Sequence, residues 1–200
     1  MATTTTNYGF DIPQSTDLVK DGATAIATLG QDIDTAMNTA LGTKKAGMVL
    51  LNTTSFSGVA SQSINSVFSA TYDDYKILIN CVASTDTDIS FRWRTSGTDN
   101  SNVSYQNRNG EYVTAFQAYD NGLRGYANIG YCRDQTNLYQ MEVANPFVAK
   151  RTNMLFHNSM ENAHILGAVL FENTTSFDGF TFFPNAGTIT GYVSVYGYNK

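Results

Sequence analysis

The sequence predicts a mainly β fold: an antiparallel β-sandwich, jelly-roll-like, preceded by an extended N-terminal arm and one short helix. Three observations support this prediction. Charged residues form only 14% of the chain and aromatic residues 12%, a balance that suits strands and turns better than surface helices. Beyond residue 46, apolar residues recur mainly at every second position, which is the period of a strand. No helix-period segment separates two of these strands, which argues against a parallel α/β sheet.

The first 20 residues are polar and show no periodicity. Pro13 interrupts this segment, and a proline disfavours helical backbone at the residue before it. Polar segments of this kind bury too little apolar surface to fold alone. We therefore expect residues 1–20 to form an extended arm that becomes ordered on a partner surface.

One helix is predicted, because the apolar residues are spaced by three and four positions around residues 21–39. Asp21 is the predicted N-cap and Gly42 the predicted end. The apolar stripe is short, so the helix is not stable by itself. It must be buried, either against symmetry mates or against the sheet of the same chain. The residues of the stripe are Val19, Gly22, Ile26, Leu29, Ile33, Ala36 and Ala40.

Residues 46–200 are predicted to form the sandwich as a single head domain. Apolar residues alternate from Tyr75 to Cys81 and from Ile89 to Trp93, which makes Trp93 a predicted core residue. Cys81 and Cys132 lie in strand-like segments, and we interpret both as reduced core residues, with a disulfide as the less favoured alternative. Further strand candidates cover residues 48–51, 64–71, 112–119, 138–144, 153–158, 165–171, 177–183 and 188–198.

The charge pattern argues against a nucleic-acid partner. The net charge is −5, and no cluster of Lys and Arg provides the positive surface that binds phosphates. The longest apolar stretches are too short to span a bilayer, and the N-terminus lacks the basic and apolar regions of a secretory signal. We therefore expect no membrane association and synthesis in a cytoplasm.

Residue patterns that support catalysis or metal binding are missing from the sequence. His157 and His164 occur in strand-like contexts and are interpreted as structural or surface histidines. There is no zinc-binding spacing, nucleophile elbow or nucleotide-binding loop. The carboxylates of segment 73–88, Asp88 among them, could pair as in a glycosidase or hold Ca²⁺, but turn formation is the favoured interpretation. We predict a non-enzymatic protein with no cofactor and no metal.

Two polar segments are candidates for recognition, because loops on rigid scaffolds often bind partners. Residues 97–110 are the longest polar stretch of the head, and residues 119–126 combine an Asn-Gly turn with tyrosines whose flat faces suit sugar rings. A plain solvated turn is the favoured interpretation of the second segment. The candidate receptor-contact residues are Tyr105, Arg108, Tyr119, Arg124 and Tyr126.

Two stretches of the chain resemble bacteriophage tail-fibre and minor virion structural proteins. The resemblance implies an N-terminal attachment segment, here with Phe10, Ile12 and Pro13, joined to a helix. It also implies a β-sandwich head completed by the final strand, and a homotrimer displayed on the virion. The matching residues are Gly9-Phe10-Asp11-Ile12-Pro13, Thr16-Asp17-Leu18-Val19-Lys20-Asp21-Gly22-Ala23, Ala25-Ile26, Leu29-Gly30 and Ile33-Asp34, and, near the C-terminus, Ile189-Thr190-Gly191-Tyr192-Val193-Ser194-Val195-Tyr196-Gly197-Tyr198.

The helix pattern and the resemblance favour different oligomers. Ile26 and Ile33 at a positions with Leu29 at d favour two-stranded coils. Met37 lies beside the stripe and widens the apolar surface, and packing against a third helix requires a wider surface. We favour the homotrimer that the resemblance implies, with a dimer left open. The predicted oligomerisation residues are Val19, Ile26, Leu29, Ile33, Ala36, Met37 and Ala40.

These observations together predict a bacteriophage virion structural protein, made in the host bacterial cytoplasm. Residues 1–20 form the attachment arm that contacts other virion proteins, residues 21–45 the oligomerisation helix and linker, and residues 46–200 the head. The expected role is a short tail fibre or similar appendage. The alternatives are a capsid-surface head fibre or decoration protein, and, less favoured, a polysaccharide-binding or -degrading tail protein. A host-surface glycan or protein is an open candidate partner of the head.

Overall fold

A computed structural model describes residues 3–6, 8–12, 18–42, 47–112, 116–161 and 163–199. The chain divides into two compact units, residues 1–47 and 48–200. The division falls close to the predicted start of the head at residue 46. Each unit is described by itself. Together the elements confirm the predicted fold class, an antiparallel β-sandwich preceded by an N-terminal segment and one helix.

The N-terminal arm is less extended than predicted, because it folds back on itself. Strands β1 (Thr3–Thr4) and β2 (Asp11–Ile12) pair in antiparallel orientation. The N–H of Thr5 donates to the carbonyl of Phe10 at 2.9 Å, and the N–H of Phe10 donates to Thr5 Oγ1 at 2.9 Å. Gly9 has a φ of 69°, a conformation that glycine adopts without steric cost. Gly9 therefore permits the turn that converts the arm into a hairpin.

The helix α1 (Val19–Gly42) covers the predicted segment and begins earlier than expected. Asp21 is not the N-cap but lies in the first turn, where its N–H donates to the carbonyl of Leu18 at 2.8 Å. A carboxylate in the first turn still interacts favourably with the positive end of the helix dipole. Gly42 is the last helical residue, in agreement with the prediction.

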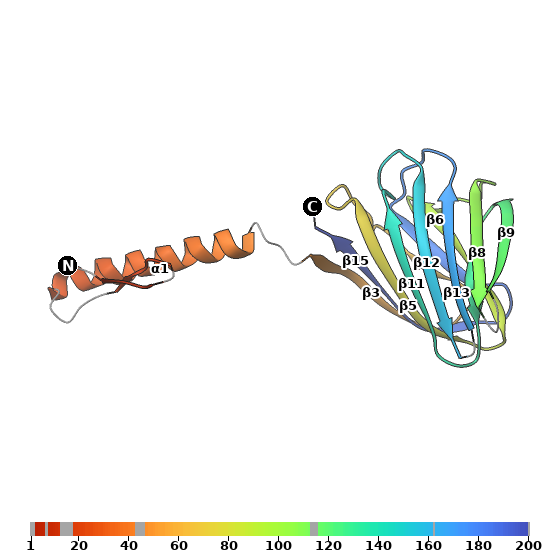
Figure 1. The fold of residues 1–200 in the computed structure, drawn as a ribbon, viewed down its shortest axis with the longest axis horizontal. Coiled ribbons are helices and arrows are strands. Elements are labelled where there is room, and N and C mark those ends of the chain that lie inside the picture. The colour runs from red at the N-terminus through yellow and green to blue at the C-terminus, as the bar shows by residue number, and fades with distance from the viewer. Residues whose placement is uncertain are drawn as a thin grey trace. The chain divides into compact units, whose positions relative to one another are not determined.

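The larger sheet of the second unit has eight strands, all antiparallel to their neighbours. Figure 1 shows these strands side by side. In spatial order they are β3 (Met48–Val59), β15 (Ile189–Tyr198), β5 (Asp74–Ala83), β11 (Asn137–Ala144), β12 (Thr152–Met160), β13 (Ala163–Phe171), β8 (Tyr105–Tyr112) and β9 (Phe116–Arg124).

The smaller sheet has five strands and forms the second layer of the sandwich. Its main path runs through four strands, and the fifth, β7 (Thr98–Asp99), pairs with β6. Strand β10 lies at one end of this path and is an edge strand of the layer. In spatial order the path is β10 (Ala127–Cys132), β6 (Thr87–Thr95), β14 (Gly179–Pro184) and β4 (Gln62–Ile64).

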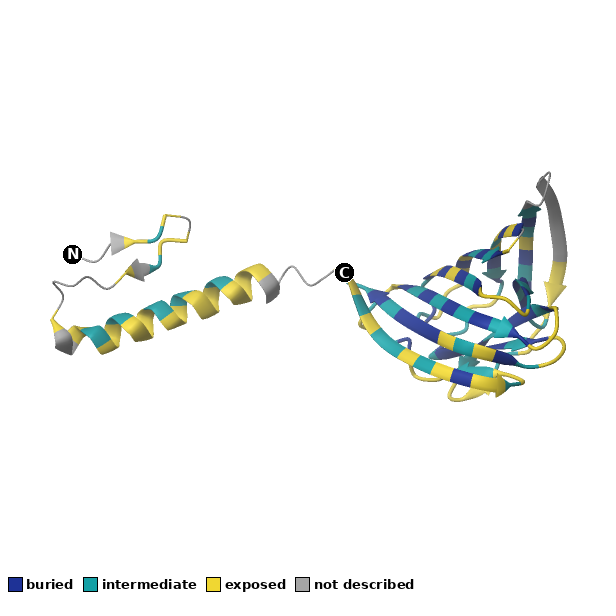
Figure 2. Cartoon of the chain, turned by 90° about the horizontal axis from the view of Figure 1, so that it is seen from below, coloured by how far each residue is buried: buried dark blue, intermediate teal, exposed yellow. Residues whose placement is uncertain are grey.

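Aromatic residues fill the space between the two layers. Buried and more exposed residues alternate along the strands, as Figure 2 shows for the head. Trp93 is fully buried, as predicted, and its ring lies 4.7 Å from Phe91 and 5.7 Å from Phe177. Phe180 stacks on Phe91 with ring centroids 5.3 Å apart. Burying such large apolar surfaces is the main stabilising contribution to a sandwich of this kind.

The two cysteines face each other across this core. Cys81 on β5 and Cys132 on β10 are buried and free, and their sulfur atoms lie 3.6 Å apart. The hydrogen bond with Cys132 and burial together raise the pKa of the Cys81 thiol, which keeps it protonated at neutral pH. Both residues lie in the core, as predicted, and their reduced state stays a prediction.

The strand predictions were wrong at several places. The predicted strand 112–119 covers the end of β8 and the start of β9, with residues 113–115 outside the described residues, and the predicted Asn-Gly turn of segment 119–126 lies within β9. Only the start of segment 64–71 belongs to a strand, because β4 ends at Ile64. Val67 and Phe68 then turn into the core, where both N–H groups donate to the carbonyl of Asp178 at 2.8 and 3.1 Å. The predicted loop of residues 97–110 contains β7 and most of β8. Composition suggested a loop there, but the backbone of β8 pairs with β13 and β9.

Candidate functional site

The predicted oligomerisation stripe is only partly covered within the chain. Ile26, Ile33 and Met37 are 67%, 39% and 55% exposed. Leu29 and Ala36, on the adjacent edge of the stripe, are half-buried, and Ala40 is exposed. Strand β2 contacts α1. Three large apolar side chains thus remain accessible on a helix, which is the pattern expected of a helix that packs on a partner.

The side chain of Val19 lies outside the description. In the predicted attachment segment, Phe10 is half-buried and its ring stacks on Tyr8 with centroids 5.6 Å apart. Ile12 is 39% exposed. Pro13 lies outside the described residues. The hairpin therefore presents Tyr8 and Ile12 to solvent and uses Phe10 partly for its own packing.

Tyr105 is not a receptor-contact residue, and this prediction was wrong. As the first residue of β8 it points into the sandwich, where it is fully buried and packs edge-on against Phe171 at 4.9 Å. Its hydroxyl accepts the N–H of Trp93 at 2.9 Å and donates to the carbonyl of Asn100 at 2.8 Å. Burial raises the pKa of this hydroxyl, which keeps it neutral and able to donate.

We expect Tyr105→Phe to lower the free energy of unfolding of the head by about 1–3 kcal/mol, because the buried N–H of Trp93 loses its acceptor. Chemical denaturation followed by fluorescence measures this change. Tyr126→Phe is the control, since Tyr126 is only half-buried and its hydroxyl accepts one long bond, at 3.4 Å, from Arg124. Equal stability of wild type and Tyr105→Phe would contradict the assigned role.

The other candidate contact residues lie at the β8–β9 edge of the larger sheet. Arg108 is exposed on β8. Arg124 is exposed, and its guanidinium lies 6.0 Å from the ring of Tyr126. Tyr119 lies on β9 with Asn109 as its Cα partner, and its side chain lies outside the description. The structure thus brings Arg124 and Tyr126 together, and whether these residues contact a receptor stays a prediction.

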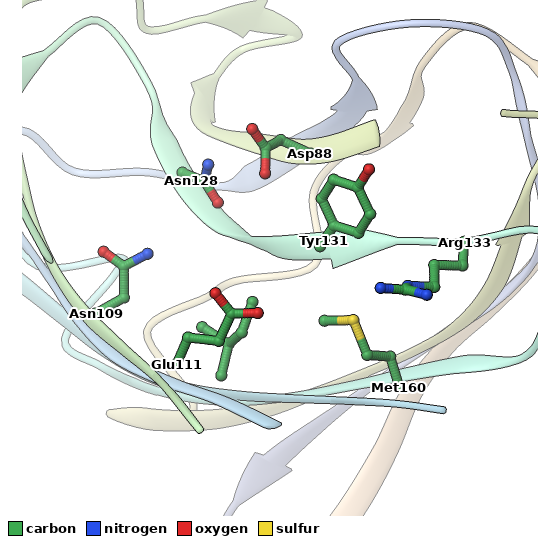
Figure 3. A pocket seen from close by; sticks show the side chains of 8 residues that line it. Asp88, Asn109, Glu111, Asn128, Tyr131, Arg133 and Met160 are labelled. Carbon is green, nitrogen blue, oxygen red and sulfur yellow. The ribbon is translucent and has the colours of Figure 1, made fainter. Parts of the chain in front are cut away.

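A pocket of about 430 Å³ opens between the two sheets next to this edge. The close view in Figure 3 shows side chains from both layers pointing toward one space. Sequence reasoning did not select this site. It is lined by Asp88 of β6, Asn109 and Glu111 of β8, Asn128 and Tyr131 of β10, Arg133, Met160 of β12 and Ile165 of β13.

Alternation along β8 explains why polar groups reach the pocket. Tyr105, Asn107, Asn109 and Glu111 occupy every second position, so they share the inner face of the sheet. Asn107 is 1% exposed and binds the backbone of β10: its Nδ2 donates to the carbonyl of Asn128 at 3.0 Å, and its Oδ1 accepts the N–H of Asn128 at 2.8 Å. This buried amide fixes β8 against β10.

A bulge in β10 places the remaining polar groups. The register with β6 shifts between Asn128 and Tyr131, and Gly130 between them has a φ of 114°. A Cβ at Gly130 would lie 2.6 Å from Oδ1 of Asn158, so only glycine fits. Asn158 Oδ1 accepts the N–H of Tyr131 at 3.1 Å, and Tyr139 donates its hydroxyl to the carbonyl of Tyr131 at 2.6 Å. The pocket wall is therefore held rigidly.

The two carboxylates of the pocket have no partner among the described residues. Within the described part of the chain, the carboxylates of Asp88 and Glu111 have no hydrogen bond or ion pair, and Nε of Arg133 is inaccessible and unbonded. The guanidinium of Arg133 lies 5.8 Å from the ring of Tyr131. Asp88 was interpreted as a turn former. That interpretation was wrong, because Asp88 lies on β6 and lines the pocket.

The remaining sequence candidates show no built chemical site. The rings of His157 and His164 lie 5.6 Å apart. Among the described residues, no three His, Cys, Asp or Glu side chains gather closely enough to hold a metal ion. A search of the same residues finds no helix whose length and hydropathy would let it cross a membrane. Asp86 is exposed, in keeping with a place in a turn.

Comparison with known proteins gives no family. No protein-family model and no curated protein sequence matches the chain. Among solved structures, the chain is similar to the galectin LEC-6 of Caenorhabditis elegans, with 8% identity, a TM-score of 0.35 and coverage of 78% of this chain and 99% of the galectin. It is also similar to a bifunctional GH43-CE protein of Bacteroides eggerthii, with 13% identity and a TM-score of 0.32.

The alignment with the Bacteroides eggerthii protein covers 62% of this chain and only 18% of that protein. A third structure is the coat protein of Tobacco streak virus, with 10% identity, a TM-score of 0.23 and coverage of 78% of this chain and 89% of the coat protein. Likenesses this weak carry no argument about function.

Proposed function

We propose that this chain is a non-enzymatic structural protein of a bacteriophage particle, a short tail fibre or similar appendage. Residues 1–20 attach it to other virion proteins, α1 joins it to symmetry mates as a homotrimer, and residues 48–200 form the displayed head. One observation carries the proposal: α1 leaves Ile26, Ile33 and Met37 exposed along one edge of its apolar stripe. Leaving such residues in water is unfavourable, and a helix of this composition becomes stable when a partner buries them.

The head supports the same role. Its core of aromatic residues between two antiparallel layers forms a rigid display unit. The resemblance of residues 9–34 to phage attachment segments supports assembly of this chain into a virion. A capsid-surface fibre or decoration protein is the alternative, because the same order of segments serves either position. Labelling the chain near Tyr198 and locating the label on purified particles by electron microscopy distinguishes the tail from the capsid.

The oligomer is tested by solution mass. The intact chain is expected to have three times the mass of one chain, whereas residues 48–200 alone are expected to be monomeric. Ile33→Asp places a charge in the stripe and is expected to dissociate the intact protein, because an unpaired buried charge costs several kcal/mol. Thr35→Asp is the matched control, since Thr35 is exposed and lies outside the stripe. Analytical ultracentrifugation measures the mass of the intact chain, of residues 48–200 and of the two aspartate variants.

A monomeric intact chain, or equal dissociation by both aspartate variants, would refute oligomerisation through α1. The virion assignment has its own test, mass spectrometry of purified particles, which is expected to detect the protein. Release of reducing ends from host capsule or cell-wall glycans by the purified chain would contradict the non-enzymatic assignment.

A further inference from the structure

We propose that the pocket between β6, β8 and β10 is a binding site for a neutral carbohydrate. The site belongs entirely to residues 48–200, so this proposal holds whether or not the chain is part of a virion. It deepens the expectation of a host-surface glycan by assigning the pocket and the side chains that would bind it.

Charged side chains that line the pocket have groups without a hydrogen-bond partner among the described residues. Buried polar groups of folded proteins nearly always have a hydrogen-bond partner in the protein or in ordered water. Here Nε of Arg133 is buried without a partner, and the carboxylates of Asp88 and Glu111 line the same concavity with no hydrogen bond or ion pair to another described residue. A ligand with several hydroxyl groups would satisfy the two carboxylates at once.

Buried hydrogen bonds hold the wall of the pocket in place. Asn107, Asn158 and Tyr139 reach across from the larger sheet and bind the backbone of β10. All three are at most 1% exposed, so their positions are set by the core. The Nδ2 atom of Asn158 is itself buried without a partner beside the pocket, one strand from Ile165. A wall held in this way is preorganised, which lowers the entropic cost of binding.

Charge decides the class of ligand. The two carboxylates repel an anion such as phosphate. Arg133 repels a metal cation, and among the described residues the pocket has too few carboxylates to hold one. Hydroxyl groups both donate and accept, so a sugar could donate to Glu111 and Asp88 and accept from Arg133. Met160 and Ile165 provide an apolar floor for the C–H face of the ring. The volume of about 430 Å³ lies within the range of small-ligand sites.

The test uses the full chain and a panel of neutral saccharides, namely lactose, maltose, cellobiose and chitobiose, each titrated by calorimetry and by saturation-transfer NMR. At least one is expected to bind. Glu111→Gln keeps the shape and removes the charge, and Arg133→Met removes the guanidinium. Each is expected to weaken that binding about tenfold or more, because a charge-assisted hydrogen bond is lost.

Glu142→Gln is the matched control, because Glu142 is exposed and binds Lys76 away from the pocket. It is expected to leave the affinity unchanged. Thermal melting of every variant establishes that the head is folded. The proposal is overturned if no saccharide of the panel binds, if Glu111→Gln and Glu142→Gln bind equally well, or if phosphate or Ca²⁺ binds in place of the sugars. None of these outcomes bears on the mass of the oligomer or on the presence of the chain in virions.

Discussion

Replacement of Trp93 by alanine is expected to lower the free energy of unfolding of the head by about 3–5 kcal/mol. The ring is fully buried and lies within 6.0 Å of the rings of Phe68, Phe91 and Phe177. Removing it leaves a cavity between the two layers that these neighbours cannot fill, because each is itself held by other ring contacts. Denaturant unfolding of residues 48–200, followed by circular dichroism, measures the loss.

Trp93→Phe is the control for this experiment. It keeps an aromatic ring in contact with Phe91 and Phe177 and removes Nε1, which is buried without a hydrogen-bond partner within the described residues. Burying an unpaired N–H is unfavourable, so its loss offsets part of the lost ring contacts. The expected cost is about 1.5 kcal/mol or less. If alanine and phenylalanine had equal effects, ring packing would not be the source of the stability.

Gly191→Ala is expected to destabilise the head by about 3 kcal/mol or more, beyond the usual cost of overpacking. A Cβ on Gly191 would lie 2.0 Å from the carbonyl oxygen of Asn80 and 2.7 Å from Cα of Cys81. Both atoms belong to the backbone of β5, the strand paired with β15 at this point. They cannot move without separating the two strands. Thermal melting of the variant measures the effect.

Gly197→Ala on the same strand is the comparison. Its Cβ would lie 2.6 Å from the ring of Tyr72, a half-buried side chain rather than backbone. The Tyr72 side chain can shift to another χ1 rotamer more readily than the β5 backbone can move, so we expect a smaller loss of stability than for Gly191→Ala. A larger loss at Gly197 would contradict the view that the close approach of β15 to the β5 backbone is what requires glycine.

The strands with apolar inner faces could be predicted from the sequence, and the strand that forms the pocket could not. On β5 and β6 every second residue is apolar, and period-two alternation located both. The inner face of β8 carries Asn107, Asn109 and Glu111, so its composition resembles that of a loop. These residues are polar because they bind β10 or line the pocket. A search for apolar alternation fails where the inward-facing residues of a strand are polar.

The candidate site was missed for a related reason. Asp88, Glu111 and Arg133 lie far apart in the sequence. The pairing of β6 with β10 in one sheet and the packing of β8 against β10 across the sandwich bring them together. Tyr105 was selected for its polar surroundings, yet its place at the start of β8 turns it inward. Residues 106–111 carry no apolar side chain, so no alternation of apolar and polar residues could have indicated this strand.

The position of β15 has a consequence for how the protein forms during translation. Among the described strands, β3 pairs only with β15, and 130 residues separate Val59 from Ile189. At roughly 5–20 residues per second, a ribosome exposes β3 on the order of ten seconds before its neighbour exists. During this time both edges of β3 are open to other nascent chains. Growth conditions that slow aggregation more than synthesis are therefore expected to favour the yield of native protein.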